Sequence, residues 1–250
     1  MADAAVLQNH TVLITGGARR VGAGVIRHLH ALGANVVIHY RNSGGDARTL
    51  GAQLNASRPR SAITVAADLL DTDQLPAVVE QTVATFGRLD ILINNASTFY
   101  PTPVGQITAA HWDDLIGTNL KAPLFLSQAA APHLRHSRGL ILNMVDIHAQ
   151  RPLKSHPVYC SAKAGLVMLT RSLARELGPE IRVNAIAPGP IMWPEHGMDQ
   201  ALKEEIIGKT ALKRAGSADD IARAITFFAT AAPYVTGQVL AVDGGRSIGW

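Results

Sequence analysis

Tyr159 and Lys163 are the pair whose residue types and spacing most directly suggest chemistry. They lie four residues apart in VYCSAKAGL, so on a helix both side chains share one face. A neighbouring ammonium favours the phenolate, so we expect Lys163 to lower the pKa of Tyr159 below its usual value of about 10 and to ease proton transfer near neutral pH. Such pairs also occur by chance on helix surfaces. A catalytic role is favoured for this pair because a nucleotide-binding turn precedes it in the chain.

That glycine-rich turn, TGGARRVG, follows the apolar run HTVLI and precedes a helix-like segment. In a strand, turn and helix unit the backbone N–H groups and the positive end of the helix dipole face a pyrophosphate. Gly16, Gly17 and Gly22 give the backbone room for that approach. Arg19 and Arg20 oppose the helix dipole unless an anion is bound, so phosphate binding is favoured over a solvated helix start.

The end of the second apolar run indicates which dinucleotide would bind. A site that prefers NAD places Asp or Glu there to bind the ribose 2′-hydroxyl, whereas HYRNS contains no acid. His39, Arg41 and Ser43 offer hydrogen-bond donors and positive charge, which favour the 2′-phosphate of NADP, and Arg19 could contact the same phosphate. The alternative for any one of these residues is a polar loop that binds no ligand. After the third run, Asp68 could accept a hydrogen bond from the adenine amino group or cap the next segment. The residues of HYRNS are His39, Tyr40, Arg41, Asn42 and Ser43.

The elements that must position these residues follow from the apolar pattern. Seven short β-branched runs alternate with segments of helical periodicity, which predicts parallel strands joined by right-handed crossovers. The runs are apolar almost throughout, as expected when helices cover both faces of a sheet. We therefore predict an α/β fold, a Rossmann-like doubly wound sheet of about seven parallel strands with helices on both faces. The runs are HTVLIT, NVVIHY, AITVA, LDILIN, GLILNMV, IRVNAIA and GQVLAV.

Composition restricts the classes of function. The 250 residues are 47% hydrophobic and 17% charged, without repeat or linker, so we expect a single domain spanning 1–250. The net charge of +4 comes from scattered basic residues, which argues against a nucleic-acid surface. The sequence has one cysteine, Cys160, so neither an internal disulfide nor a cysteine metal cluster can form. We interpret Cys160 as a packing residue. With neither a signal-peptide pattern nor an apolar run of membrane length, we expect a cytoplasmic protein without a bound metal.

Together these motifs resemble the short-chain dehydrogenase/reductase family over essentially the full chain. The matching marks, in order, are TGGARRVG, Asp68, Asn94-Asn95-Ala96, Asn119, Tyr159 with Lys163, and Pro188-Gly189. The resemblance implies a single NADP-binding reductase domain in which Tyr159 donates a proton, Lys163 binds the nicotinamide ribose and Asn119 anchors a water relay. It implies further cofactor contacts from Val21, Leu69, Asn95, Ala96, Ser97, Pro188 and Gly189.

Two departures from the family pattern resemble its pteridine reductases. Arg20 stands where the family usually has glycine, and Asp146, thirteen residues before Tyr159, stands where it usually has serine. The stretches HYRNS, NNASTFYPTP and NMVDIHAQRPL are similar to that subgroup as well. The resemblance implies that Arg20 bridges the cofactor pyrophosphate and a pterin, so that one cation serves both ligands.

The chemistry of a pterin fits this resemblance. Reducing its C=N bond requires hydride at carbon and a proton at the adjacent nitrogen, and an aspartate beside the tyrosine can orient the heterocycle and pass the proton through the phenol. The alternative for Asp146 is a helix cap or loop acid. Phe99 would stack on the pterin, unless it is a core aromatic, and Ser97 would contact the pterin edge. The loop PGPIMWPEHG would cover the substrate. Its residues expected to contact substrate or shape selectivity are Pro190, Met192 and Trp193.

The expected function is therefore NADPH-dependent reduction of oxidised or dihydro pterins, with folates as further candidate substrates. One alternative is a reductase of small ketones or 3-oxoacyl thioesters. Another, of a different class, is a non-catalytic nucleotide sensor, against which the presence of Tyr159 and Lys163 argues. The resemblance also implies a homotetramer built through helices near Asn119 and Tyr159 and through the C-terminal strand. We expect no nucleic-acid or membrane partner.

Overall fold

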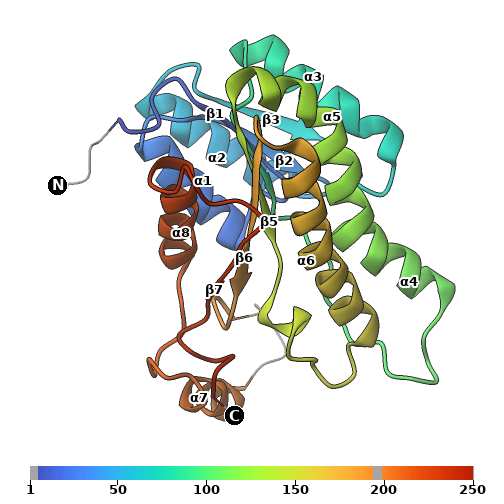
Figure 1. Cartoon of the computed structure of the whole chain (residues 1–250). Helices are drawn as coiled ribbons and strands as arrows, with labels where there is room; N and C mark the ends of the chain where they lie inside the picture. The colour runs from blue at the N-terminus through green and yellow to red at the C-terminus, as the bar shows by residue number, and fades with distance from the viewer. Residues whose placement is uncertain (1–4, 194–198, 250) are drawn as a thin grey trace.

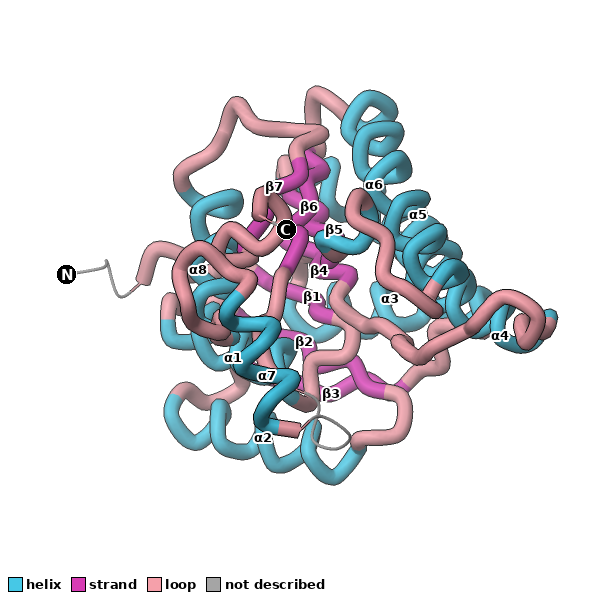
Figure 2. The backbone as a smooth tube through the Cα atoms, turned by 90° about the horizontal axis from the view of Figure 1, so that it is seen from below, coloured by secondary structure: helices cyan, strands magenta, loops and turns pink. Residues whose placement is uncertain are grey.

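Seven parallel strands form one sheet in the computed structural model, which describes residues 5–193 and 199–249. Their order is β3-β2-β1-β4-β5-β6-β7, so the winding of the chain reverses between the neighbours β1 and β4 (Figure 2). All seven predicted runs are strands, and the predicted doubly wound, Rossmann-like fold is confirmed. The strands are β1 Thr11–Ile14, β2 Asn35–Tyr40, β3 Ala62–Ala66, β4 Ile91–Asn94, β5 Leu140–Met144, β6 Arg182–Pro188 and β7 Val239–Val242.

Helices cover both faces of this sheet (Figure 1). Helices α1, α2 and α8 pack on one face, and α3, α5 and α6 pack on the other. The helices are α1 Arg20–Ala31, α2 Gly44–Ser57, α3 Leu75–Phe86, α4 Ala109–Ile116, α5 Ala122–Ser137, α6 Pro157–Leu177, α7 Gln200–Gly208 and α8 Ala218–Thr230.

Strand β1 shows why both faces must be covered. Val12 and Ile14 pack into the cluster of α1 and α8, whereas Leu13 packs into the cluster of α3 and α5 on the opposite face. Successive side chains of a strand point to opposite faces, and all three are fully buried. Burying each side chain contributes about 1.5–3 kcal/mol. The apolar runs therefore lack a polar face because no face of the strand meets water.

The carboxyl ends of the strands carry most of the predicted site. The glycine turn follows β1, HYRNS joins the end of β2 to the start of α2, Asn94 ends β4, and Asp146 comes two residues after β5. Parallel strands end at the same edge of a sheet, so these segments lie around one crevice at the reversal between β1 and β4.

Candidate active site

Asp146 and Tyr159 meet at the carboxyl end of β5. The Oδ1 atom of Asp146 accepts a 2.8 Å hydrogen bond from the backbone N–H of His148 and so caps the short 3-10 helix Ile147–Ala149. The Tyr159 hydroxyl, on the third residue of α6, donates a 2.7 Å hydrogen bond to the other oxygen, Oδ2. Asp146 thus combines the two roles considered for it, helix cap and partner of the tyrosine.

Lys163 lies on the same face of α6 as Tyr159, as their spacing predicts. Its Nζ is 5.7 Å from the centroid of the Tyr159 ring and donates a 2.8 Å hydrogen bond to the carbonyl of Met144. Burial lowers the pKa of Lys163 to about 8, while the charge of Asp146 acts in the opposite direction. The lysine amine is therefore a buried part of the site rather than a solvated group on the helix surface.

The expected lowering of the Tyr159 pKa is wrong for this structure. Burial raises the pKa of Tyr159, and so do the charge of Asp146 and the hydrogen bond to it, whereas the Ser97 hydroxyl acts in the opposite direction. Burial is the largest cause, and the carboxylate adds to it because it touches the phenol, while the Lys163 Nζ is hydrogen-bonded to a backbone carbonyl. Tyr159 therefore keeps its proton at neutral pH, although a raised pKa by itself makes the phenol a weaker acid.

Asn119 lies in a π-helical turn, Gly117–Lys121, between α4 and α5. The sequence pattern gave no sign of this turn, although π-turns are frequent at functional sites. The buried Asn119 carboxamide accepts a 2.7 Å hydrogen bond from the Ser97 hydroxyl and donates one of 3.0 Å to the Thr98 carbonyl. Asn119 thereby fixes the segment that carries Ser97 and Phe99, and its part in a water relay stays a prediction.

Phe99 lies beside Tyr159 and is 52% exposed, which excludes the alternative of a core aromatic. Its ring stacks on His156, with centroids 4.7 Å apart and planes 12° apart, and meets the Tyr159 ring at a steep angle, 78°, with centroids 4.8 Å apart. Sequence reasoning missed His156, which directly precedes α6. The signal that could have found it is its place three residues before the tyrosine. Stacking of Phe99 on a ligand stays a prediction.

The glycine turn after β1 leaves no room for a side chain at Gly16 or Gly22. Gly16 has a φ of +63°, and a Cβ added there would lie 3.0 Å from the Cα of Ala96. A Cβ at Gly22 would lie 2.3 Å from the carbonyl oxygen of Gly16. The Asn95 carboxamide closes the turn from the other side by donating to the carbonyls of Thr15 and Gly16, at 2.8 and 3.2 Å. Asn95 and Ala96 therefore lie against the turn that the sequence assigns to phosphate.

A cavity of about 230 Å³ lies between this turn and the end of β2. Arg19 Nε is 2.7 Å from an oxygen of Asp46, and Arg41 Nη1 is 3.8 Å from one of Asp68. Asp46, in the first turn of α2, is an acid beside the site that the prediction from HYRNS did not include, because it lies three residues further along the chain. The cavity brings together predicted cofactor residues from two loops. It is lined by Gly16, Ala18, Arg19, Tyr40, Arg41, Asn42 and Ser43.

Three further predicted cofactor residues have structural contacts of their own. Asp68 Oδ1 accepts a 3.1 Å hydrogen bond from the backbone N–H of Leu70, which supports the capping alternative, while its pairing with Arg41 keeps it beside the cavity. Leu69 is buried in the cluster of α3 and α5, and Val21 packs against the cluster of α1 and α8.

His39 does not offer a donor to the cavity, and that part of the prediction is wrong. The residue is 1% exposed. Its Nδ1 accepts a 3.2 Å hydrogen bond from the backbone N–H of Gly16, and its Nε2 lies 3.2 Å from the carbonyl of Ala67. Burial lowers the pKa of His39 to about 4, so the ring is neutral near pH 7. Neighbouring side chains on a strand point to opposite faces, which is why Tyr40 lines the cavity and His39 does not.

Arg20 begins α1 with a φ of +50°, a conformation that glycine adopts more easily. For a residue with a Cβ it costs about 1 kcal/mol, and strain of this kind is typical of functional sites. The Nη2 of Arg20 donates to the carbonyls of Met192 and Trp193, at 3.0 and 3.4 Å. Its guanidinium therefore joins the glycine turn to the loop after β6.

The loop after β6 starts close to β7. The backbone N–H of Gly189 donates to the carbonyl of Val242 at 3.1 Å, and the carbonyl of Pro190 accepts a 2.9 Å hydrogen bond from the N–H of Gly216. Pro188 is the last residue of β6. The predicted covering loop, residues 188–197, is described as far as Trp193, and residues 194–198 lie outside the described part of the chain.

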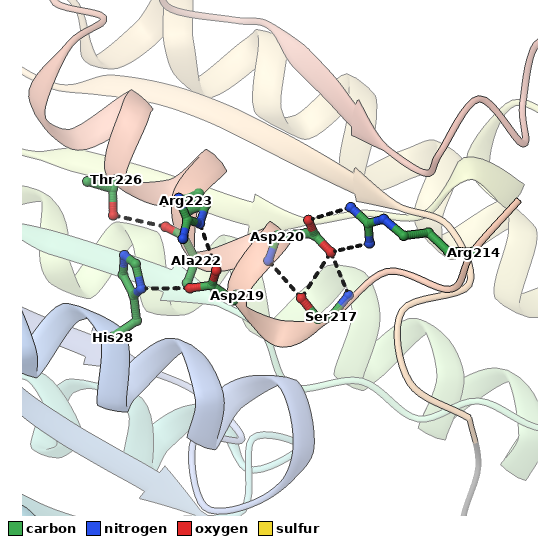
Figure 3. A network of polar contacts seen from close by, with 8 residues as sticks. All are labelled: His28, Arg214, Ser217, Asp219, Asp220, Ala222, Arg223 and Thr226. Atoms are coloured by element: carbon green, nitrogen blue, oxygen red, sulfur yellow. Dashed lines mark hydrogen bonds and ion pairs between the residues drawn. The ribbon is translucent and has the colours of Figure 1, made fainter. Parts of the chain in front are cut away.

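Figure 3 shows the polar contacts where the chain returns from this loop to α8. Arg214 donates two hydrogen bonds to the Asp220 carboxylate, at 2.9 and 3.0 Å, and the backbone N–H of Ser217 donates to the same carboxylate at 2.8 Å. Nearby, His28 Nδ1 of α1 lies 3.1 Å from an oxygen of Asp219 at the start of α8. The contact between His28 and Asp219 joins the start of α8 to α1, the helix that follows the glycine turn and packs against α8.

Two absences hold for residues 5–193 and 199–249. No group of three or more His, Cys, Asp or Glu residues there could hold a metal ion. None of the helices described in those ranges is long and apolar enough to cross a membrane. Cys160 is buried, and its sulfur accepts a 3.4 Å hydrogen bond from the N–H of Leu153.

A doubly wound sheet, a glycine turn at its reversal point and a tyrosine with a lysine one helical turn later define an oxidoreductase of the short-chain dehydrogenase/reductase class. Residues 16–247 match the family model described as enoyl-(acyl carrier protein) reductase. The chain belongs to this family of short-chain dehydrogenases/reductases.

Named relatives cover nearly the whole chain. Pteridine reductase 1 of Leishmania tarentolae is 38% identical over 280 residues, which cover 94% of this chain and 96% of the relative. A 3-oxoacyl-(acyl-carrier-protein) reductase FabG of Staphylococcus aureus is 34% identical over 239 residues, 94% of this chain and 97% of the relative. Among solved structures, a blue fluorescent protein from a metagenomic library in complex with NADPH is 33% identical, with a TM-score of 0.89 over 96% of this chain and 98% of that one.

Proposed function

We propose that the protein is an NADPH-dependent pteridine reductase, which reduces C=N bonds of oxidised or dihydro pterins and has folates as further candidate substrates. The observation that carries the proposal is the 2.7 Å hydrogen bond from the Tyr159 hydroxyl to the Asp146 carboxylate. A carboxylate there can accept hydrogen bonds from the N–H and amino groups of a heterocycle, whereas the serine usual in the family offers a hydroxyl suited to a carbonyl oxygen. The similarity to a pteridine reductase at 38% identity supports the same substrate class.

NADPH is the cofactor that we infer, since the solved relative at 33% identity binds it and the residues of this chain fit it. The cavity beside Arg19, Arg41 and Ser43 would take the 2′-phosphate, and the turn at Gly16 would face the pyrophosphate together with Arg20. Further proposed cofactor contacts come from Tyr40, Asn42, Asp68, Asn95, Ala96, Ser97, Tyr159, Lys163, Pro188 and Gly189.

The proton would move through the chain's own residues. When bound, the nicotinamide supplies a hydride to the carbon of the C=N bond. Tyr159 gives its proton to the adjacent nitrogen, and Asp146, hydrogen-bonded to the phenol, returns a proton from solvent to the phenol oxygen. While it is protonated, Lys163 offsets the negative charge that develops on the phenol. One hydride and one proton are then added for each C=N bond reduced.

The flat substrate would bind at the exposed side of this site. Phe99, half exposed and held by its stack on His156, provides an aromatic surface next to Tyr159. Ser97 would contact the edge of the pterin, and Arg20 would bridge the pterin and the pyrophosphate. From the loop after β6, Pro190 and Trp193 would complete the substrate contacts.

The alternative is reduction of small ketones or 3-oxoacyl thioesters, which the 34% identical staphylococcal relative favours. Tyr159 would then protonate a carbonyl oxygen. A non-catalytic NADP-binding sensor has less support, because Tyr159 and Lys163 are both present and lie on one helix face.

A purified-protein assay separates these functions. NADPH consumption is followed at saturating cofactor with dihydrobiopterin and, in parallel, with an acetoacetyl thioester. We expect faster turnover with the pterin. Oxidation with the thioester alone would overturn the proposal in favour of the ketoacyl alternative, and stoichiometric NADPH binding without turnover on either substrate would favour the sensor.

We also propose a homotetramer. Leu124 and Phe125 on α5 and Leu240 on the edge strand β7 are large apolar side chains left partly exposed, which fits burial between subunits. Light scattering coupled to gel filtration tests this, and a monomeric mass at assay concentration would contradict it.

A further inference from the structure

His39 lies between two loops of the proposed cofactor site. Strand β2 has β1 on one side and β3 on the other (Figure 2). The glycine turn follows β1, and the segment with Ala67 and Asp68 follows β3. The two segments come from different parts of the chain, yet a dinucleotide bound at this edge of the sheet needs both.

The His39 ring reaches both segments with its two nitrogens. Nδ1 accepts a hydrogen bond from the N–H of Gly16 at 3.2 Å, and Nε2 lies 3.2 Å from the carbonyl of Ala67. A backbone N–H can only donate and a carbonyl can only accept, so these partners require the neutral ring with its proton on Nε2. The backbone of His39 adds a third contact, because its carbonyl accepts a 2.9 Å hydrogen bond from the N–H of Gly17.

The cost of losing this ring falls on the glycine turn. Gly16 has a left-handed φ and lies against Ala96, so its N–H has little freedom to turn elsewhere. A fully buried N–H without a partner costs roughly 1–3 kcal/mol. Gly16 is partly buried and lines the cavity, so movement of the backbone or entry of water lowers this cost. In either case the turn that would face the pyrophosphate loses the ring contact that ties it to the loop after β3.

We propose that His39 is a positioning residue that couples the glycine turn to the loop after β3, and so sets the affinity for the dinucleotide without touching it. The inference deepens the proposed function, on whose NADPH it rests. It replaces the direct contact with the 2′-phosphate expected from sequence. Two observations support the inference: the ring is buried, and its two nitrogens contact one donor, the Gly16 N–H, and one acceptor, the Ala67 carbonyl.

Direct binding of NADPH tests the coupling. His39→Leu removes both ring contacts, and we expect its dissociation constant, from NADPH fluorescence, to rise on the order of tenfold. His39→Asn keeps an acceptor for Gly16 but shortens the reach to Ala67, so we expect a smaller rise. At saturating NADPH, turnover should stay within about twofold of the wild-type value, because His39 contacts no reacting group.

His30 provides a matched control. It is also a buried histidine, with Nε2 2.7 Å from the Ser61 hydroxyl, but it lies in the last turn of α1, near the opposite edge of the sheet. His30→Leu loses a buried hydrogen bond as well, so we expect a lower melting temperature with unchanged NADPH affinity. If His39→Leu and His30→Leu changed affinity equally, the effect would be general destabilisation and the inference would fall.

The protonation of the His39 ring can also be observed in the wild-type protein, so this test does not depend on the folding of a variant. Isotope labelling of histidine and nitrogen NMR should show His39 as the neutral ring with its proton on Nε2, both with and without NADPH. A proton on Nδ1 would overturn the inference, and so would wild-type NADPH affinity in both His39 variants. Tight NADPH binding without pterin turnover would instead defeat the proposed function and leave the role of His39 standing.

Discussion

The catalytic end and the phosphate end of the site hold their charges in different ways. Asp146 and Tyr159 are joined by a 2.7 Å hydrogen bond, and the Lys163 ammonium is buried against a backbone carbonyl. At the other end, Arg19 and its partner Asp46 are 60% and 45% exposed, and Arg20 binds loop carbonyls. The catalytic charges are held by short contacts within the chain, whereas the phosphate-facing cations have partners that an anion could replace.

Solvent accounts for this difference. Breaking the buried contact of Lys163 leaves an amine that water cannot reach, at about 3–5 kcal/mol, whereas an exposed ion pair contributes roughly 0.2–1 kcal/mol. Substitutions at the catalytic end should therefore cause the larger losses, and the phosphate end should tolerate an exchange of ion-pair partners. Substitutions at each end test this contrast.

The largest expected effect is at Asp146. In Asp146→Asn one acceptor oxygen must choose between the His148 N–H and the Tyr159 hydroxyl, and the amide cannot return a proton to the phenol. Turnover of dihydrobiopterin should fall on the order of 100-fold, the usual range for loss of a proton-transfer group. NADPH affinity, measured separately, should be unchanged. Asp146→Ser should be impaired as well, and full pterin turnover in both variants would remove the distinction on which the pterin assignment rests.

Much of this arrangement could be predicted because it depends on local patterns. Seven β-branched runs gave seven strands, and the four-residue spacing placed Tyr159 and Lys163 on one helix face. Asp146 came from the resemblance, not from spacing alone. Its hydrogen bond to Tyr159 closes a loop of thirteen residues whose path no periodicity determines.

Other features depend on three-dimensional surroundings and could not be predicted. Which face of β2 carries His39 depends on how the strand lies in the sheet. The sign of the Tyr159 pKa shift depends on burial and on the distance to Asp146. The left-handed Arg20 and the π-turn around Asn119 are backbone conformations that residue type does not reveal. Cytoplasmic location stays a prediction.

Lys163 tests whether the buried end is electrostatically strained. Its folded-state pKa of about 8 lies below the usual 10.5, so between these values the unfolded chain binds more protons. Stability should then rise with pH across this window, by at most about 1.4 kcal/mol per pH unit, relative to Lys163→Met. Denaturant unfolding of both proteins at pH 8, 9 and 10 measures the difference. If the difference in free energy of unfolding between the two proteins did not change with pH, the lysine amine would be better solvated than its position indicates.

Arg20 tests the strain at the phosphate end. Arg20→Gly and Arg20→Ala both remove the guanidinium, but only glycine relaxes the φ of +50°. The glycine variant should be about 1 kcal/mol more stable than the alanine variant. Both should raise the KM for dihydrobiopterin to a similar extent, on the order of tenfold, because both lose the bridging cation. Equal melting temperatures would show that this backbone conformation costs nothing.

The smallest expected effect is at Asp46, whose carboxylate holds the Arg19 guanidinium 2.7 Å away beside the cavity. Asp46→Asn frees this guanidinium for a 2′-phosphate and removes a nearby negative charge, so affinity for NADPH should rise roughly two- to fivefold. NADH, which lacks the 2′-phosphate, should gain little. Asp113→Asn on α4 is the matched control, since it removes an exposed acid from another helix. The gain should shrink at about 0.5 M salt, where exposed charges are screened. Weaker NADPH binding in Asp46→Asn would mean that Asp46 orients Arg19 for the phosphate instead of competing for it, and the exposed end would then be as preorganised as the buried one.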